Sequence, residues 1–279
     1  MLSAGSAVAL VALYAIALGT SGGRRIDASA EHELAYTGGS RLDALNHVIL
    51  VSVDPVLVLA AALAGFFLLR GRVRDALAAG ALLALVNGLA YGLKLLLYWL
   101  DPLGGEAART SDVASFPSGH TAAAISAGLV AIVLAPRTSR VPVTLACAVY
   151  AAAVGLASVA DGGHYPSDVA ASYLIAMVVA GGVAASRRLT PARLREPAPS
   201  RGQTVALTGL VAVVSLAGAS YWVDLALAGS DLATYVRDSP TAAVVAPALG
   251  ALSILLVCTY GALCGAPARP PSRLHHGSC

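Results

Sequence analysis

Long apolar runs alternate with short polar connections along the chain. Eight of these runs have about the 20 residues that a helix needs to cross the hydrocarbon core of a bilayer. They fall near residues 4–21, 47–69, 76–100, 118–136, 141–160, 166–186, 203–229 and 240–265. None shows the two-residue alternation of a membrane β-strand. The pattern therefore predicts an all-α fold, a polytopic bundle of membrane helices.

Composition excludes a soluble domain. Hydrophobic residues make up 57% of the 279 residues and charged residues 12%, and the mean hydropathy is +0.76. A water-soluble domain of this size cannot bury so much apolar surface, so lipid must surround most of it. The first run has no basic segment before it, which favours an uncleaved first span over a signal peptide.

Charges in the connections predict the topology. Most arginines lie in one set of connections, and most acids lie in the other set. The arginine-rich set is 70–74, 137–140, 187–201 and the tail after 265, and the acidic set is 22–46, 101–117, 161–165 and 230–239. The positive-inside rule places the arginine-rich set and both termini in the cytoplasm. The net charge of +3 then reflects topology and not a nucleic-acid interface.

A basic, proline-rich segment divides the predicted spans into two groups. We expect a six-span core, a cytoplasmic linker, a two-span extension and a disordered cytoplasmic tail. These four parts are residues 1–186, 187–202, 203–265 and 266–279.

Lys94 is the only lysine of the chain. It lies about one and a half turns inside the outer end of the third run, or roughly 9 Å at 1.5 Å per residue. An ionisable group at this depth is costly and indicates function, and the structural alternative is snorkelling to the outer headgroups. Function is favoured because the outer ends of the other runs have few cations.

The sequence Pro117-Ser118-Gly119-His120 opens the fourth run. Serine is a favoured N-cap, and the first turn of a helix has unpaired N–H groups that bind anions. Glycine lets an oxyanion approach the backbone, and a histidine there can protonate a departing oxygen. The same four residues are equally compatible with a purely structural role, as the capped start of a helix with an interfacial histidine.

The sequence Gly163-His164-Tyr165-Pro166-Ser167-Asp168 opens the sixth run on the same predicted side. Because proline is tolerated in a first helical turn, His164 and Asp168 would lie four residues apart on one face. The carboxylate would then fix the tautomer of the ring and leave its other nitrogen free as a nucleophile. Three polar clusters at the outer ends of three spans favour one shared site.

Lys94, the PSGH of 117–120 and the GHYPSD of 163–168 resemble, in order and spacing, the type-2 phosphatidic acid phosphatase family. Membrane lipid phosphatases and vanadium haloperoxidases share that fold, and the resemblance covers the first six spans. It implies that His164 forms a phosphohistidine, that Asp168 orients it and that His120 protonates the leaving alcohol. The implied cradle for the phosphoryl oxygens is Lys94, Ser118 and the Gly119 backbone. It implies no metal and no other cofactor.

Two arginines of the family pattern are absent. In the first motif, six residues usually separate the lysine from an Arg-Pro pair, where this chain has Asp101-Pro102. The third motif usually has an arginine six residues before its histidine, where this chain has Ser158, preceded by Ala157 in place of the usual serine. Because arginine forks match phosphate geometry, phosphate binding should be weaker without them.

Three explanations of the missing arginines are open. Arg109, in the loop before PSGH, is the expected substitute for binding the substrate phosphate. A divalent ion held by Asp101, Asp112 or Asp161 is the second explanation, although their spacing is not compact. The third is a degenerate protein that binds a phospholipid headgroup without turnover. Activity is favoured because the nucleophile, its orienting acid and the general acid are present.

The expected function is that of an enzyme, a membrane lipid phosphatase with an extracytoplasmic site. Its substrate and partner would be a lipid phosphate in the bilayer, such as polyprenyl phosphate or diphosphate, phosphatidic acid or phosphatidylglycerophosphate. The alternatives are a phosphotransferase of the same chemistry, a non-catalytic lipid-phosphate binder or transporter, and a structural membrane protein.

Overall fold

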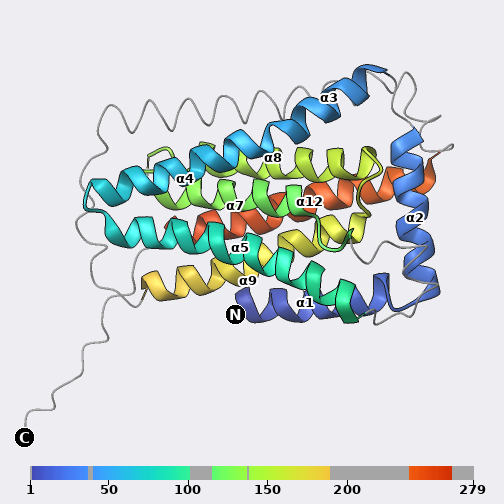
Figure 1. Ribbon diagram of the computed structural model, residues 1–279, viewed down its shortest axis with the longest axis horizontal. Coiled ribbons are helices and arrows are strands. Elements are labelled where there is room, and N and C mark those ends of the chain that lie inside the picture. Colours follow the sequence, from blue (N-terminus) through green and yellow to red (C-terminus); the bar gives the residue numbers. More distant parts are fainter. Residues whose placement is uncertain (1, 37–39, 101–114, 137, 189–238, 266–279) are drawn as a thin grey trace, which may run out of the picture.

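The computed structural model describes residues 2–36, 40–100, 115–136, 138–188 and 239–265 (Figure 1). All regular structure in these ranges is helical. The helices are α1 (Leu2–Ala17), α2 (Ser21–Tyr36), α3 (Ser40–Val51), α4 (Val53–Leu69), α5 (Val73–Leu100), α7 (Gly119–Leu134), α8 (Arg140–Ala160), α9 (Pro166–Arg188) and α12 (Pro240–Gly265).

Within the described ranges, five helical segments are long and apolar enough to cross a membrane. They are Asp43–Leu69, Val73–Leu100, Arg140–Ala160, Pro166–Ser186 and Pro240–Cys264. α7 is apolar but shorter, and α1 together with α2 would make a sixth span only as a pair bent by 90°. The predicted all-α polytopic bundle is confirmed. The span expected at 203–229, most of the linker and the tail 266–279 lie outside the described residues.

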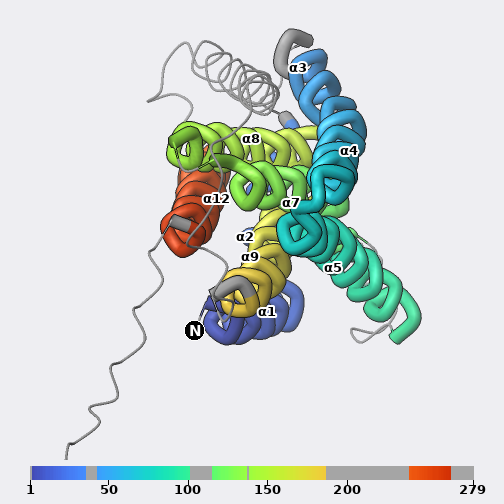
Figure 2. Tube along the Cα trace, turned by 90° about the vertical axis from the view of Figure 1, so that its left-hand side faces the viewer, coloured from blue at the N-terminus to red at the C-terminus, as the bar shows by residue number. Residues whose placement is uncertain are grey.

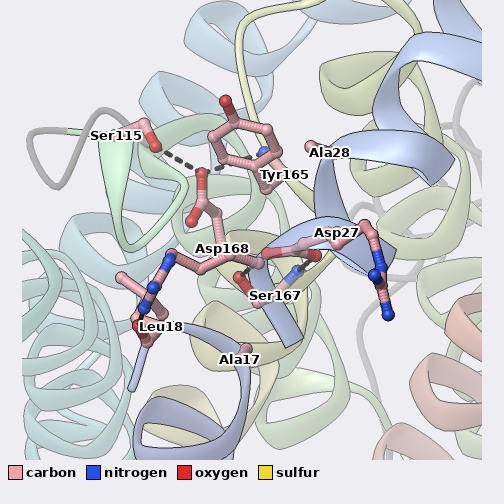
Figure 3. Close-up of a pocket in the computed structure, with 10 residues that line it drawn as sticks. Ala17, Leu18, Asp27, Ala28, Ser115, Tyr165, Ser167 and Asp168 are labelled. Carbon is pink, nitrogen blue, oxygen red and sulfur yellow. Dashed lines mark hydrogen bonds between the residues drawn. The ribbon is translucent and has the colours of Figure 1, made fainter. Parts of the chain in front are cut away.

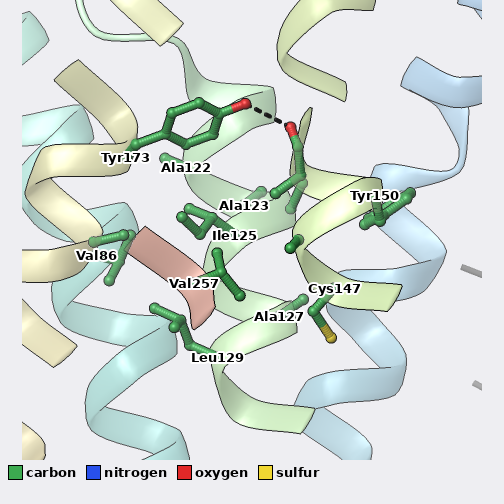
Figure 4. Close-up of a cluster of buried hydrophobic side chains, with 14 of the residues drawn as sticks. Val86, Ala122, Ala123, Ile125, Ala127, Leu129, Cys147, Tyr150, Tyr173 and Val257 are labelled. Carbon is green, nitrogen blue, oxygen red and sulfur yellow. Dashed lines mark hydrogen bonds between the residues drawn. The ribbon is translucent and has the colours of Figure 1, made fainter. Parts of the chain in front are cut away.

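α7 is the central helix of the bundle. Every side chain from Thr121 to Leu134 is buried, and α7 lies between α8, α9 and the α4–α5 pair (Figure 2). Small residues allow this close packing. For example, Gly155 of α8 faces α9, where the Tyr173 hydroxyl donates to the Ala151 carbonyl oxygen at 2.8 Å (Figure 4). With 16 residues, α7 is about 24 Å long, whereas the 28 residues of α5 extend about 42 Å.

The outer helices have one buried and one exposed apolar face. On α5, Leu82 and Val86 are fully buried, whereas Leu77 and Trp99 are 65% and 75% exposed. α4 follows the same pattern, and both helices lie at the edge of the bundle (Figure 2). Exposed apolar side chains at such density are stable against lipid but not against water.

α12 belongs to the same bundle as α8 and α9, although it lies outside the six-span core that the motifs predict. The Ser253 hydroxyl donates to the Ala148 carbonyl oxygen at 3.0 Å. The buried Arg140 guanidinium at the start of α8 donates to the Cys264 carbonyl oxygen at 3.0 Å, near the end of α12. These bonds join the two helices at two levels.

The segment 22–46, expected as a loop, contains helices. α1 ends at Ala17, and α2 turns 90° away from it and crosses one end of the bundle (Figure 1). α7, α9 and α12 all begin at this end, which is called the site end below. α2 is polar, with two arginines and three acids in its sequence, so it lies across the bundle and outside the membrane-crossing segments.

The close contact of α8 and α9 can be tested at Gly155. A Cβ there would lie 2.7 Å from Val169 Cγ1 and closer still to the Tyr173 hydroxyl. We expect Gly155→Ala to lower the free energy of unfolding by about 1–3 kcal/mol through overpacking. Thermal unfolding in detergent would measure this effect.

The matched control is Gly92→Ala on the exposed side of α5, where an added Cβ meets open space among the described residues. Alanine is the better helix former by roughly 0.5–1 kcal/mol, so this variant should be slightly more stable. Equal effects of the two substitutions would contradict the packing described here.

Candidate active site

The two histidine motifs are joined by backbone hydrogen bonds. The Ser118 amide donates to the Asp168 carbonyl oxygen at 3.1 Å. The Ser172 hydroxyl lies within hydrogen-bond distance of both motifs: it is 2.8 Å from the Ser118 carbonyl oxygen and 2.9 Å from the Asp168 carbonyl oxygen. All three residues are buried. The first turn of α9 therefore holds the start of α7, although 50 residues of chain separate Ser118 from Asp168.

His164 and Asp168 form the predicted pair. His164 Nδ1 lies 3.2 Å from Asp168 Oδ2. The same oxygen accepts from the Tyr165 amide at 3.0 Å and from the Ser115 hydroxyl at 2.7 Å, and the Asp168 side chain is buried. Because a carboxylate oxygen can only accept hydrogen bonds, the imidazole proton of His164 must be on Nδ1. The lone pair on Nε2 is then free for attack.

A glycine turn directs the chain from α8 into this pair. α8 ends at Ala160 with Asp161 as its C-cap, and Gly162 follows with φ of 74°. The Gly162 amide donates to the Val159 carbonyl oxygen at 2.9 Å and closes the last turn. Left-handed backbone of this kind favours glycine. The reversal brings His164 to the site end of α9.

Ser118 is the predicted N-cap of α7. Its hydroxyl oxygen accepts from the Thr121 amide at 3.4 Å and from the Thr121 hydroxyl at 3.0 Å, and it is buried. Gly119 and His120 are exposed, and a Cβ on Gly119 would meet open space among the described residues. The motif therefore offers an open backbone and an imidazole at its surface, while the serine hydroxyl supports the turn from within.

Lys94 lies close to the histidine–aspartate pair. Its ammonium is partly buried on α5 and interacts electrostatically with the Asp168 carboxylate. α5 packs against both α7 and α9. Lys94 and Asp168 thus lie within electrostatic range of each other, although they are 74 positions apart in the sequence.

At the position of the second missing arginine, the Ser158 hydroxyl is bonded within its own helix. The Ser158 hydroxyl donates to the Val154 carbonyl oxygen of its own helix at 2.8 Å, and Ser158 and Ala157 are both buried. Arg109, Asp101 and Asp112 lie outside the described residues. In the described part of the chain, no three His, Cys, Asp or Glu side chains are grouped to hold a metal ion.

A cavity of about 220 Å³ lies beside the pair, between the α1–α2 bend and the first turn of α9 (Figure 3). Its lining is Ala17, Leu18, Arg24, Arg25, Asp27, Ala28, Ser115, Tyr165, Ser167 and Asp168. Neither His120, His164 nor Lys94 lines it, so the cavity adjoins the pair without containing the nucleophile. It shares the Asp168 carboxylate with the pair.

Asp27 attaches α2 to the first turn of α9. Its Oδ1 accepts from the Ser167 amide at 3.0 Å, and its Oδ2 accepts from the Ser167 hydroxyl (Figure 3). Burial raises the pKa of Asp27 to about 6; the Asp168 charge adds to the rise, and the two bonds from Ser167 oppose it. The motifs did not identify Asp27. The signal available in the sequence was a proline-free segment, 21–36, of residues compatible with a helix.

Comparison with known proteins found one match, which covers part of the chain. Residues 78–190 match the model of the PAP2 superfamily. This range contains α7, α8, α9 and most of α5, and with them the lysine, both histidines and Asp168. Proteins of this superfamily are generally phosphoric ester hydrolases. No curated protein and no solved structure matches the chain.

The tie between the motifs can be tested with Ser172→Ala. Both carbonyl oxygens keep a backbone donor, because Ser118 still receives the Ala122 amide and Asp168 the Ser118 amide. We therefore expect a moderate loss of about 1–2 kcal/mol in the free energy of unfolding. Chemical denaturation in mild detergent would measure it. Ser186→Ala, near the other end of α9 and exposed, is the control and should change stability by less than half as much.

Proposed function

Because residues 78–190 form a PAP2-type segment, we propose that the chain is a membrane-bound phosphatase that removes a phosphoryl group from a lipid. The observation that carries this proposal is the arrangement of the histidine–aspartate pair. The buried carboxylate of Asp168 orients His164, and the backbone carbonyl oxygen of the same residue accepts from the Ser118 amide of the PSGH turn. Lys94 is within electrostatic range of that carboxylate. Phosphoryl transfer needs this combination of a positioned nucleophile and nearby positive charge.

The proposed reaction has two steps. His164 Nε2 attacks phosphorus, the bond from phosphorus to the ester oxygen breaks, and His120 gives its proton to the departing oxygen. The phosphoryl group is then carried on His164. In the second step His120 takes a proton from water, the water oxygen attacks phosphorus, and phosphate leaves with Nε2 restored. Asp168 keeps the Nδ1 proton in place throughout.

Charge on the phosphoryl oxygens would be balanced by Lys94 and by the amide groups of the first turn of α7. Gly119 leaves that turn open to an approaching oxyanion. The Ser118 hydroxyl is bonded to Thr121, so its proposed part in the cradle is to hold the turn in shape. Arg109 is the proposed third cation.

The lengths of the helices around the site support a lipid substrate. α7 is about 18 Å shorter than α5, and Lys94 lies roughly 9 Å before the end of α5. A phosphate at headgroup level would meet these groups while its acyl or prenyl tails stay beside the apolar faces of the bundle. Candidates are polyprenyl phosphate or diphosphate and phosphatidic acid. The arginine distribution supports an extracytoplasmic site end and cytoplasmic termini.

The absence of both motif arginines supports a second candidate, a lipid-phosphate binder without turnover. Ser158 is buried and bonded within α8, so nothing at its position contacts a phosphate. Measurements of phosphate release and of lipid binding distinguish turnover from binding alone.

Purified wild type should release phosphate from at least one member of a panel of lipid phosphates, and His164→Ala should not. Asp168→Asn keeps the shape of the side chain but weakens the acceptor, and should lower kcat by about 10²–10⁴-fold. Phosphate release in detergent micelles would be measured, with acid-quenched samples tested for phosphohistidine. Lipid binding without release would favour the binder, and transfer to an added alcohol would favour a phosphotransferase.

Arginine substitutions locate the missing cation. Arg109→Ala should raise KM at least about tenfold, because a charge-assisted bond to phosphate is lost. Arg25→Ala, at the exposed edge of the cavity, should leave kinetics unchanged. If Arg109→Ala has unaltered kinetics and Arg24→Ala has a raised KM, the phosphate-binding cation is Arg24 of α2 and not Arg109.

A further inference from the structure

α2 carries two acids that bond to the starts of two different helices. Asp27 accepts from the Ser167 amide at 3.0 Å at the start of α9. Glu33, at the other end of α2, accepts from the Ala242 amide at 2.7 Å at the start of α12. The first amides of a helix have no partner within it, and a negative charge there is stabilised by the helix dipole. α2 is therefore fixed across the site end at two points.

The two contacts differ in what they support. Ser167 lies in the first turn of α9, directly before Asp168, the residue that orients His164. Asp27 holds Ser167 by both its amide and its hydroxyl (Figure 3). Ala242, in contrast, belongs to a helix that carries no part of the histidine motifs. Only the Asp27 contact can influence the direction of the nucleophile.

We propose that Asp27 is a positioning residue for the phosphoryl transfer: it fixes the Ser167 backbone and thereby the Asp168 carboxylate that orients His164. The proposal rests on the proposed function. It places a support for the reaction outside the PAP2-type segment, because Asp27 precedes residue 78 by 51 positions. Its burial, and the raised pKa that follows, fit a carboxylate enclosed between two elements.

The expected consequence is a change in turnover without a change in lipid binding. In-line attack depends on the direction of Nε2, and small misplacements of a reacting group reduce rates strongly. Asp27 has no role in the proposed cradle for the phosphoryl oxygens. Its loss should therefore lower kcat and leave KM close to that of the wild type.

The experiment compares Asp27→Ala, Asp27→Asn and Glu33→Ala in the full chain. The assay is phosphate release from dioleoyl phosphatidic acid in detergent micelles, or from whichever panel lipid the wild type hydrolyses. We expect Asp27→Ala to lower kcat by about 10- to 100-fold with KM within twofold. Asp27→Asn should recover part of the loss, because the amide oxygen still accepts from the Ser167 amide. Glu33→Ala should keep the kcat of the wild type.

Two kinetic outcomes overturn the proposal. One is a wild-type kcat for Asp27→Ala. The other is an equal loss for Glu33→Ala, which would show that α2 matters only for general stability. Thermal unfolding of all three variants, measured in parallel, shows whether any lost activity reflects unfolding.

Hydrogen–deuterium exchange separates failure of this proposal from failure of the proposed function. A wild type without phosphate release from any lipid would contradict the function, and exchange would then decide the positioning. Asp27→Ala should speed exchange of the amides in 166–172, and Glu33→Ala should speed exchange in 240–246 instead. Unchanged exchange in 166–172 of Asp27→Ala would overturn the positioning role, whatever the activity.

Discussion

The site depends on the hydrogen bonds that tie the start of α7 to the first turn of α9. The Ser118 amide, the Asp168 carbonyl and the Ser172 hydroxyl form a buried polar group in an otherwise apolar bundle. Unpaired polar groups in such surroundings are costly, so the two helix starts have little freedom to separate. The side chain of Asp168 is fixed by three donors at the same time, and the direction of His164 follows from it.

The helices around the site differ in length. α5 has 28 residues and α7 has 16, and the exposed apolar faces of α4 and α5 are suited to contact with lipid. Lys94 lies in an apolar membrane-capable helix, where a cation is costly without an anion, and the Asp168 carboxylate supplies one.

α2 adds a second layer of support at the site end. Its acids cap α9 and α12, and its arginines border a cavity that adjoins Asp168. α12 is in turn bonded to α8 along its length. The segment that matches the PAP2 model therefore packs against elements from both ends of the chain. None of these elements carries a histidine motif. They contact the site region through packing, hydrogen bonds and charged side chains.

The sequence by itself determined the all-α membrane bundle, the N-cap at Ser118 and the pairing of His164 with Asp168. These features depend on local spacing, because an apolar run, a capping residue and a pair four residues apart at the start of α9 each involve only neighbouring residues of the chain. Only the tertiary structure decided that Lys94 lies near Asp168, that Ser158 turns into its own helix and that Asp27 bonds to Ser167. Such contacts join residues up to 140 positions apart, and they arise from how side chains of several helices pack together, which no local pattern specifies. The helix at 21–36 was missed for the same reason, since its polar sequence becomes a defined element through its contacts with the starts of α9 and α12.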